Sequence, residues 1–235
     1  MSYNIHGCVG ADGRFDVERI ASVLDEIRAD VYLLQEVGDR VGREPTFDQA
    51  KVLASALDLE YAAGYTMPTG PWGYGNVVLA RGRIDSSRRF DLSVTGREPR
   101  GCLRIDLTLP CRQGLTVVAV HLGLAWGERR SQIDQLLGDH GPISGVKPPL
   151  VLGGDFNDWP PGPATRLLGR SFLDAAWPSL DFRGTFPSRW PLLRLDRLYS
   201  RGRLRVEDYR VHRSRLAAIA SDHLPIVAGY AMADT

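Results

Sequence analysis

The sequence predicts an α+β fold, in which stacked β-sheets are covered by helices. Short apolar runs typical of strands outnumber the segments with helical spacing, and few of these runs lead directly into a helix. This order differs from the regular βαβ alternation of a parallel α/β fold. Several runs are continuously apolar, as expected of strands covered on both faces. No linker divides the chain, so residues 1–235 are expected to form a single domain, and a hydrophobic content of 43% supplies its core.

Three segments have the spacing of apolar residues that is typical of amphipathic helices. The first covers residues 16–28, with Asp16 in the position of the N-cap. The second covers residues 47–57. The third covers residues 128–137 and is expected to end with Gly138 in the C′ position.

Most of the remaining chain is expected to form strands. A first strand begins at residue 1, and a second covers residues 31–34. Later strands are expected at 76–81, 102–109, 115–122, 150–154, 193–199 and 224–230. The segment WPPGP, at 159–163, is expected to be a stiff loop that fixes the exit from the strand before it.

The composition excludes several classes of protein. Cys8, Cys102 and Cys111 form no CxxC pair, so neither a disulfide framework nor a structural zinc site is expected. No apolar run approaches the roughly 18 residues of a membrane span, and no leader is visible. A location in the reducing cytoplasm is therefore the expectation.

Charge is distributed unevenly, although the net charge is only +1. Residues 183–215 contain ten arginines and three acidic residues, whereas the whole chain has only two lysines. Arginine forms forked, bidentate contacts with phosphate, so this segment could bind a polyanion. A solvated arginine-rich surface is the alternative.

Polar side chains occur where several of the predicted strands end. In VLGGDFND an apolar run stops at two glycines and is followed by Asp155 and Asn157. Glu36 follows the apolar run YLLQ, and His121 lies near the end of TVVAVHL. Carboxylate and amide oxygens at such strand ends suit a hard divalent cation and a phosphate. Taken alone, Glu36 could also be a solvated strand end, and His121 a core histidine.

Three further segments extend this set. Asn4, in YNIHG, could serve a site or cap a turn. Asp196, in RLRLDRLYS, could serve a site or pair with a neighbouring arginine. In SDHLPIV, Asp222 directly precedes His223 and could orient its imidazole. Adjacent side chains on an extended backbone point to opposite faces, however, so Asp222 could serve another purpose.

The order, strand-end positions and residue types of these segments resemble the endonuclease/exonuclease/phosphatase superfamily, which has the fold of deoxyribonuclease I. The resemblance extends from Asn4 to His223, and GDFN and SDH are its most specific motifs. It implies a four-layer α/β/β/α sandwich, in which two mixed β-sheets are flanked by helices and the site lies at one end of the sheets. The segments that carry it are YNIHG, DVYLLQEV, GNVVLAR, VVAVHLGL, VLGGDFND, RLDRLY and SDHLPI. The helix expected after His121 resembles small bacterial members.

The resemblance also implies a metal site and a proton acceptor. Glu36 would be the main ligand of Mg²⁺ or Mn²⁺, and Asn4 and Asp222 would be further ligands. His223, oriented by Asp196 or Asp222, would take a proton from the attacking water.

Three more roles follow from the same resemblance. Asp155 would be the rival to His223 as the base. Asn157 would donate a hydrogen bond to a phosphate oxygen. His121 would stabilise the transition state or protonate the leaving alkoxide.

The implied function is a Mg²⁺- or Mn²⁺-dependent phosphoester hydrolase, with a phosphodiesterase acting on nucleic acid or a phospholipid head group as the first choice. The alternatives are a phosphomonoesterase for small or inositol-type phosphates, and a non-catalytic member that binds phosphate or lipid. No protein partner is expected. Several aromatic residues near the strand ends could stack on bases or contact lipid, but packing in the core or in loops is the commoner fate of tryptophan. They are Trp72, Tyr74, Trp126, Trp159 and Trp190.

Overall fold

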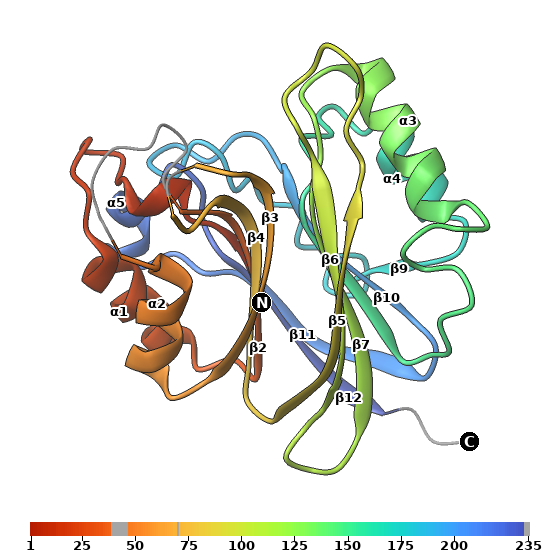
Figure 1. The fold of residues 1–235 in the computed structure, drawn as a ribbon, viewed down its shortest axis with the longest axis horizontal. Helices are drawn as coiled ribbons and strands as arrows, with labels where there is room; N and C mark the ends of the chain where they lie inside the picture. Colours follow the sequence, from red (N-terminus) through yellow and green to blue (C-terminus); the bar gives the residue numbers. More distant parts are fainter. Residues whose placement is uncertain (39–46, 70, 233–235) are drawn as a thin grey trace.

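The computed structural model describes residues 1–38, 47–69 and 71–232. Two six-stranded sheets lie face to face (Figure 1). Helices α1, α2 and α5 cover the outer face of one sheet, and α3 and α4 cover the outer face of the other. The predicted four-layer α/β/β/α sandwich is therefore confirmed.

The first sheet has the strand order β11-β12-β1-β2-β4-β3. Only β1 and β2 run parallel in it, so the sheet is mixed. Its strands are β1 (Ser2–Asn4), β2 (Val31–Val37), β3 (Glu60–Met67), β4 (Tyr74–Ala80), β11 (Leu204–Val211) and β12 (Ile226–Met232).

The second sheet has the order β5-β6-β7-β8-β10-β9, and its parallel pair is β7 with β8. The other pairs are antiparallel. Its strands are β5 (Arg83–Asp91), β6 (Gly101–Thr108), β7 (Gly114–His121), β8 (Leu150–Asp155), β9 (Leu173–Asp174) and β10 (Asp196–Arg201).

The helices predicted from periodicity are present. Helix α1 (Val17–Ile27) begins after Asp16, whose side chain accepts a hydrogen bond from the Arg19 amide, and α2 is Gln49–Leu57. Helix α3 (Trp126–Leu137) begins two residues earlier than expected. Gly138 ends it in an extended conformation (φ −67°, ψ 166°), so the prediction of a left-handed C′ glycine is wrong.

Two short helices were not predicted, because neither has enough turns to show a period. Helix α4 (Pro163–Leu168) begins at the last residue of the WPPGP segment, so the expected loop ends before Pro163, and α5 (Ala217–Ala220) precedes the last strand. A short 3-10 turn also covers His6–Cys8. Among the described residues, no helix is long and apolar enough to cross a membrane.

The strands missing from the prediction are the ones at the sheet edges. The four edge strands are β11, β3, β5 and β9. Edge strands have fewer neighbours to bury them, and in β5 most side chains are exposed. They therefore lack the apolar runs by which the central strands can be recognised in a sequence.

Apolar side chains from both sheets pack together between them. Leu33 and Val78 of the first sheet belong to one buried cluster with Leu103, Ile105 and Val117 of the second. This layer fixes the relative position of the two sheets, and with it the position of the polar residues at the strand ends.

Candidate active site

Strand register brings three of the predicted site residues together in the second sheet. In the parallel pair, His121 of β7 lies opposite Asp155 of β8. In the antiparallel pair, Asp155 lies opposite Asp196 of β10. Because β7 and β8 end where β10 begins, the three side chains share one end of the sheet.

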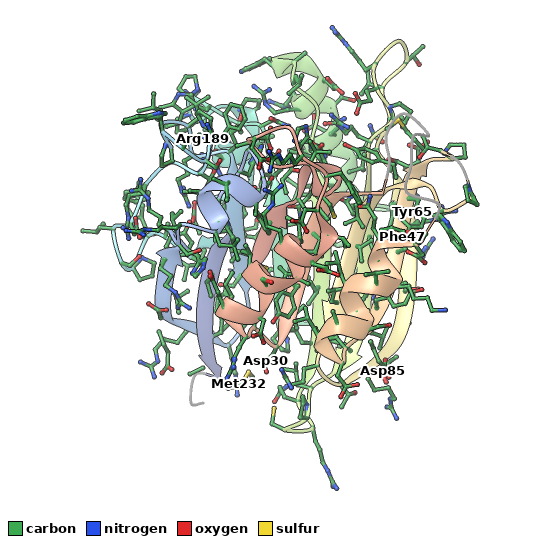
Figure 2. All side chains as sticks on the ribbon, turned by 90° about the vertical axis from the view of Figure 1, so that its left-hand side faces the viewer. Asp30, Phe47, Tyr65, Asp85, Arg189 and Met232 are labelled. Carbon is green, nitrogen blue, oxygen red and sulfur yellow. The ribbon has the colours of Figure 1, made fainter. Side chains whose placement is uncertain are left out.

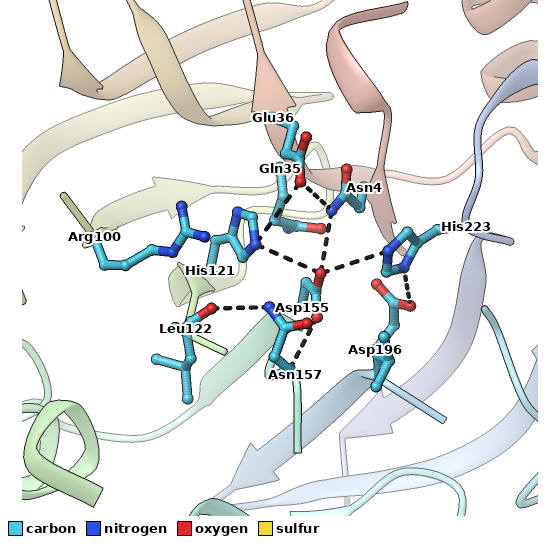
Figure 3. Close-up of polar contacts among 12 residues, drawn as sticks. Asn4, Gln35, Glu36, Arg100, His121, Leu122, Asp155, Asn157, Asp196 and His223 are labelled. Atoms are coloured by element: carbon cyan, nitrogen blue, oxygen red, sulfur yellow. Dashed lines mark hydrogen bonds and ion pairs between the residues drawn. The ribbon is translucent and has the colours of Figure 1, made fainter. Parts of the chain in front are cut away.

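The first sheet supplies the facing residues. Parallel pairing sets Asn4 of β1 opposite Gln35 of β2, next to Glu36. His223 lies just before β12, which pairs with β1 on its other side. The same end of the first sheet thus carries an amide, a carboxylate and an imidazole (Figure 3).

Hydrogen bonds connect the two sheets through these side chains. Asn4 Nδ2 donates to Glu36 Oε1 at 2.9 Å within the first sheet and to Asp155 Oδ2 at 3.1 Å across to the second. His223 Nδ1 lies 2.8 Å from Asp196 Oδ2, which is a second link across the sheets. The site is therefore an interface between the sheets and depends on their packing.

His223 is paired so that its charged form is favoured. Burial alone would favour the neutral imidazole, but the nearby carboxylates of Asp196 and Asp155 outweigh it and raise the pKa of His223 to about 10. Its Nε2 lies 3.7 Å from Asp155 Oδ2. The ring of Phe186 packs against the imidazole at a centroid distance of 5.0 Å.

His121 has the opposite tendency. Its Nε2 lies 3.6 Å from Asp155 Oδ2 and 3.9 Å from Glu36 Oε1. Burial and the positive charge of Arg100 nevertheless lower its pKa below the ordinary value. At neutral pH the site thus holds one imidazolium and one neutral imidazole, on either side of Asp155 (Figure 3).

Asp155 is fully buried and holds a fixed orientation. Its Oδ1 accepts a hydrogen bond from the Asn157 backbone amide at 2.9 Å, and its Oδ2 faces Asn4 and both histidines. Burial, together with the charge of Asp196, raises the pKa of Asp155. Asn157 has a left-handed backbone (φ 49°), and its Nδ2 donates to the Leu122 carbonyl at 2.9 Å.

Glu36 is ionised despite its burial. Burial would raise its pKa, but electrostatic attraction to the protonated form of His121 and hydrogen bonds from Asn4 and Tyr74 lower it to about 2. The pairing of β2 with β4 shifts register between Leu34 and Val37, and Glu36 has a left-handed backbone there (φ 56°). Its side chain keeps 18% exposure, so a cation can reach the carboxylate.

The donor atoms suit a hard divalent cation at Glu36. The ionised Glu36 carboxylate supplies oxygen ligands of the kind that Mg²⁺ prefers. Asn4 turns its Nδ2 toward Glu36 and Asp155, and its Oδ1 accepts a hydrogen bond from the His6 amide. A second group, formed by Asp155, Asp196 and His223, has one ligand atom from each residue within 4.8 Å of the others. The Nδ1 atom of His223 is bound to Asp196, so Nε2, which lies 3.7 Å from Asp155 Oδ2, is the nitrogen that would face a metal in this second group.

In the described part of the chain, the Asp222 side chain has polar contacts with Ser221 and His6 and none with the other predicted metal ligands. Its carboxylate accepts from Ser221 Oγ at 3.3 Å and lies 3.9 Å from His6 Nδ1. Within the part of the chain that the structure describes, no hydrogen bond or ion pair joins it to Asn4 or Glu36. The structure therefore gives Asp222 the weakest support of the eight predicted site residues.

Five of the ten arginines of residues 183–215 form ion pairs with carboxylates in the described part of the chain. Arg194 and Arg197 are buried and both pair with Asp174, at 2.7 and 3.4 Å. Several others pair with acidic neighbours, as Arg183 does with Asp181 and Arg210 with Asp208. Asp196 is free of such pairing because it is bound to His223.

Two residues of the VLGGDFND segment have a structural role. A side chain on Gly154 would place its Cβ 1.9 Å from the Val120 carbonyl oxygen, so the glycine is required by strand packing. Asp158 is fully buried and bonds Arg129 at 3.2 Å, while its other oxygen accepts from the Gly162 and Thr165 amides. This carboxylate organises the loop after the site.

Arg100 is the residue that sequence reasoning missed. It is buried just before β6, and its Nη1 donates a hydrogen bond to Glu98 Oε1 at 2.5 Å. Its positive charge lowers the pKa of His121. Its Nε has no hydrogen-bond partner among the described residues. No spacing signals it, because it is one arginine in an arginine-rich chain and only the fold brings it beside His121 (Figure 3).

Comparisons with known proteins agree with this geometry. The model of the Endonuclease/Exonuclease/phosphatase family matches residues 1–223. Protein YbhP of Escherichia coli (strain K12) is 31% identical over 210 residues, which cover 85% of this chain and 83% of YbhP.

Two solved structures illustrate the similarity of fold. The endonuclease/exonuclease/phosphatase from Beutenbergia cavernae DSM 12333 has a TM-score of 0.79 and 23% identity, and the match covers 99% of this chain and 70% of that one. The mannosyl-6-phosphatase Bt3783 of Bacteroides thetaiotaomicron VPI-5482 has a TM-score of 0.74 and 18% identity, with 98% of each chain covered. The chain belongs to the endonuclease/exonuclease/phosphatase family.

Proposed function

We propose that this protein is a divalent-metal-dependent phosphodiester hydrolase. The observation that supports this most is the environment of Asp155 Oδ2, which lies 3.1 Å from Asn4 Nδ2, 3.6 Å from His121 Nε2 and 3.7 Å from His223 Nε2. A carboxylate held between two imidazoles of opposite tendency to ionise is suited to acid–base chemistry. Membership in a family of phosphoester hydrolases supports phosphorus as the reacting atom.

Asp155 is the residue that we assign as the proton acceptor. Its raised pKa makes it a stronger base than an ordinary carboxylate, whereas His223 already favours its protonated form. Water adds to phosphorus as the ester P–O bond breaks, one water proton passes to Asp155, and the leaving alkoxide takes a proton from solvent. The products are a phosphomonoester and an alcohol.

The other side chains would stabilise charge on the phosphoryl group. The His223 imidazolium, oriented by Asp196, would donate to a non-bridging oxygen, and Asn157 would help to position the group. His121, next to Glu36, would donate a hydrogen bond to the leaving oxygen. Mg²⁺ or Mn²⁺ held by Glu36 and assisted by Asn4 would neutralise phosphate charge.

Hydrolysis of a phosphomonoester is the second candidate, since one protein with this fold is a mannosyl-6-phosphatase. A test uses bis(4-nitrophenyl) phosphate as the diester and 4-nitrophenyl phosphate as the monoester, each with Mg²⁺, with Mn²⁺ and with EDTA. We expect metal-dependent cleavage of the diester, at a higher rate than the monoester.

The matched variants are Asp155→Asn and Asp139→Asn, because Asp139 is exposed and lies outside the site. Asp155→Asn should reduce the rate at least about 100-fold, and Asp139→Asn should retain it. Cleavage that survives EDTA, or an Asp155→Asn variant with the wild-type rate, would overturn the proposal. Faster cleavage of the monoester would favour the second candidate.

A further inference from the structure

All five tryptophans of this chain are exposed. The exposed fraction of the residue is 44% for Trp72, 45% for Trp159, 63% for both Trp126 and Trp177, and 79% for Trp190. The tryptophans expected near the strand ends are therefore not packed in the core, whereas Tyr74, named with them, is buried. Large aromatic side chains are usually buried in a soluble protein, so this much exposed indole surface indicates an interaction site.

Three loops bring most of this surface to the end of the molecule that carries the site. One loop follows His121 at the end of β7, a second follows Asp155 at the end of β8, and a third precedes Asp196 at the start of β10. Strand register puts those three residues side by side, so the loops border the site on the side of the second sheet. The apolar rim that they form consists of Leu124, Trp126, Trp159, Trp190 and Leu192.

Buried polar contacts hold the first two loops together. Arg129 Nη1 donates to the Leu124 carbonyl in one loop, and Arg129 Nε donates to Asp158 Oδ1 in the other at 3.2 Å. Both charged side chains are buried. The apolar residues of these loops are therefore presented by a rigid base.

The third loop is fixed to the site itself. The Ser188 amide donates to the Asp222 carbonyl, and Ser188 Oγ donates to the Ser221 carbonyl at 2.7 Å. Phe186 at the base of the loop packs against His223. Trp190 and Leu192 nevertheless extend into solvent, and such exposure on a well-anchored loop favours contact with a ligand over loose packing.

We propose that the apolar rim docks the protein onto a phospholipid surface and presents a phospholipid phosphodiester to the site. Leu124 and Leu192 are 75% and 74% exposed, and an aliphatic side chain has no π-face on which a base could stack. Tryptophan and leucine together suit the boundary between head groups and acyl chains. The substrate class rests on the proposed function, but the docking surface does not.

Charge and position agree with this partner. Arg189 is exposed next to Trp190 and, among the described residues, forms no ion pair, so it is available to a lipid phosphate. Figure 2 shows Arg189 at the opposite end of the molecule from Met232. Because the rim borders the site, a protein that covered it would hinder access of the substrate, whereas a lipid surface would deliver one.

The test measures co-sedimentation with vesicles of phosphatidylcholine that contain a minority of phosphatidylglycerol, in EDTA so that no lipid is hydrolysed. The double variant Trp190→Ser/Leu192→Ser is compared with Met232→Ser, an exposed apolar residue at the far end. We expect wild type and Met232→Ser to bind, and the double variant to bind at least about tenfold more weakly. Far-ultraviolet circular dichroism checks that the variants are folded.

Equal vesicle binding by wild type and the folded double variant would overturn the inference. So would absence of vesicle binding combined with binding of a single-stranded oligonucleotide that the double variant loses, because the rim would then contact bases. Vesicle binding without hydrolysis of any phosphoester would leave the docking surface standing and contradict the proposed function. Cleavage of bis(4-nitrophenyl) phosphate without vesicle binding would leave the proposed function standing and contradict the docking surface.

Discussion

The two ends of the sheet sandwich are held together in different ways. At the site end, Asn4 bonds Asp155 and His223 bonds Asp196, so polar side chains join the sheets. At the far end the sheets separate around a groove of about 660 Å³, whose lining includes Val31, Leu115 and Val227. At the site end, hydrogen bonds between polar side chains join the two sheets. The far end is open and largely apolar.

This difference shows that the candidate catalytic residues also have a structural task. Removing one partner of a buried charged hydrogen bond leaves the other without compensation, which is costly. Substitutions at the site end should therefore affect activity and stability together. Substitutions in the groove should affect neither strongly, because the groove has room for added side-chain atoms.

The largest expected effect follows from breaking the His223–Asp196 link. An Asp196→Asn variant removes the charge that orients His223 and favours the imidazolium. The rate of diester cleavage should fall at least about 100-fold, and kcat should fall more than KM rises. A variant with the wild-type kcat would show that this link between the sheets is structural only.

A smaller effect is expected in the dependence of stability on pH. Because the pKa of His223 is raised from 6.5 to about 10, its ion pairs contribute stability that is fully present below pH 6.5 and is lost as pH rises through about 10. Urea unfolding of the metal-free protein and of His223→Gln measures this contribution. The difference in unfolding free energy between the two should shrink toward pH 10; a constant difference would contradict the raised pKa.

The smallest effect is expected at the open end. Ala228 lines the groove and is half-buried, so Ala228→Leu can extend into free space. The free energy of unfolding should change by less than about 1 kcal/mol, and diester cleavage should be unchanged. A loss of several kcal/mol would show that the far end is packed as tightly as the site end.

The sequence predicts the central strands and the site residues because both have local signals. A continuous apolar run such as 150–154 identifies a covered strand, and a polar residue directly after it, such as Asp155, identifies the strand end. The edge strands lack the first signal, since β5 is exposed on most of its length. The register that sets His121, Asp155 and Asp196 side by side depends on long-range pairing, which no local pattern contains.

Arg100 and the apolar rim show where local signals fail. Arg100 lowers the pKa of His121 although it lies before β6 and His121 ends β7, and its sequence context is ordinary. The large apolar ring of tryptophan favours packing in the core or in loops. Only the structure shows that Trp126, Trp159 and Trp190 are exposed to solvent. The missing information in both cases is which segments cover one another.

The position of β12 between β11 and β1 has a consequence for synthesis of the protein. The site takes Asn4 from the first strand and His223 from the turn into the last, and the first sheet is incomplete until that last strand is inserted between β11 and β1. During synthesis, His223 can therefore pair with Asp196 only after residue 223 has left the ribosome. A nascent chain that ends before His223 has neither the complete first sheet nor the link between the two sheets that His223 makes.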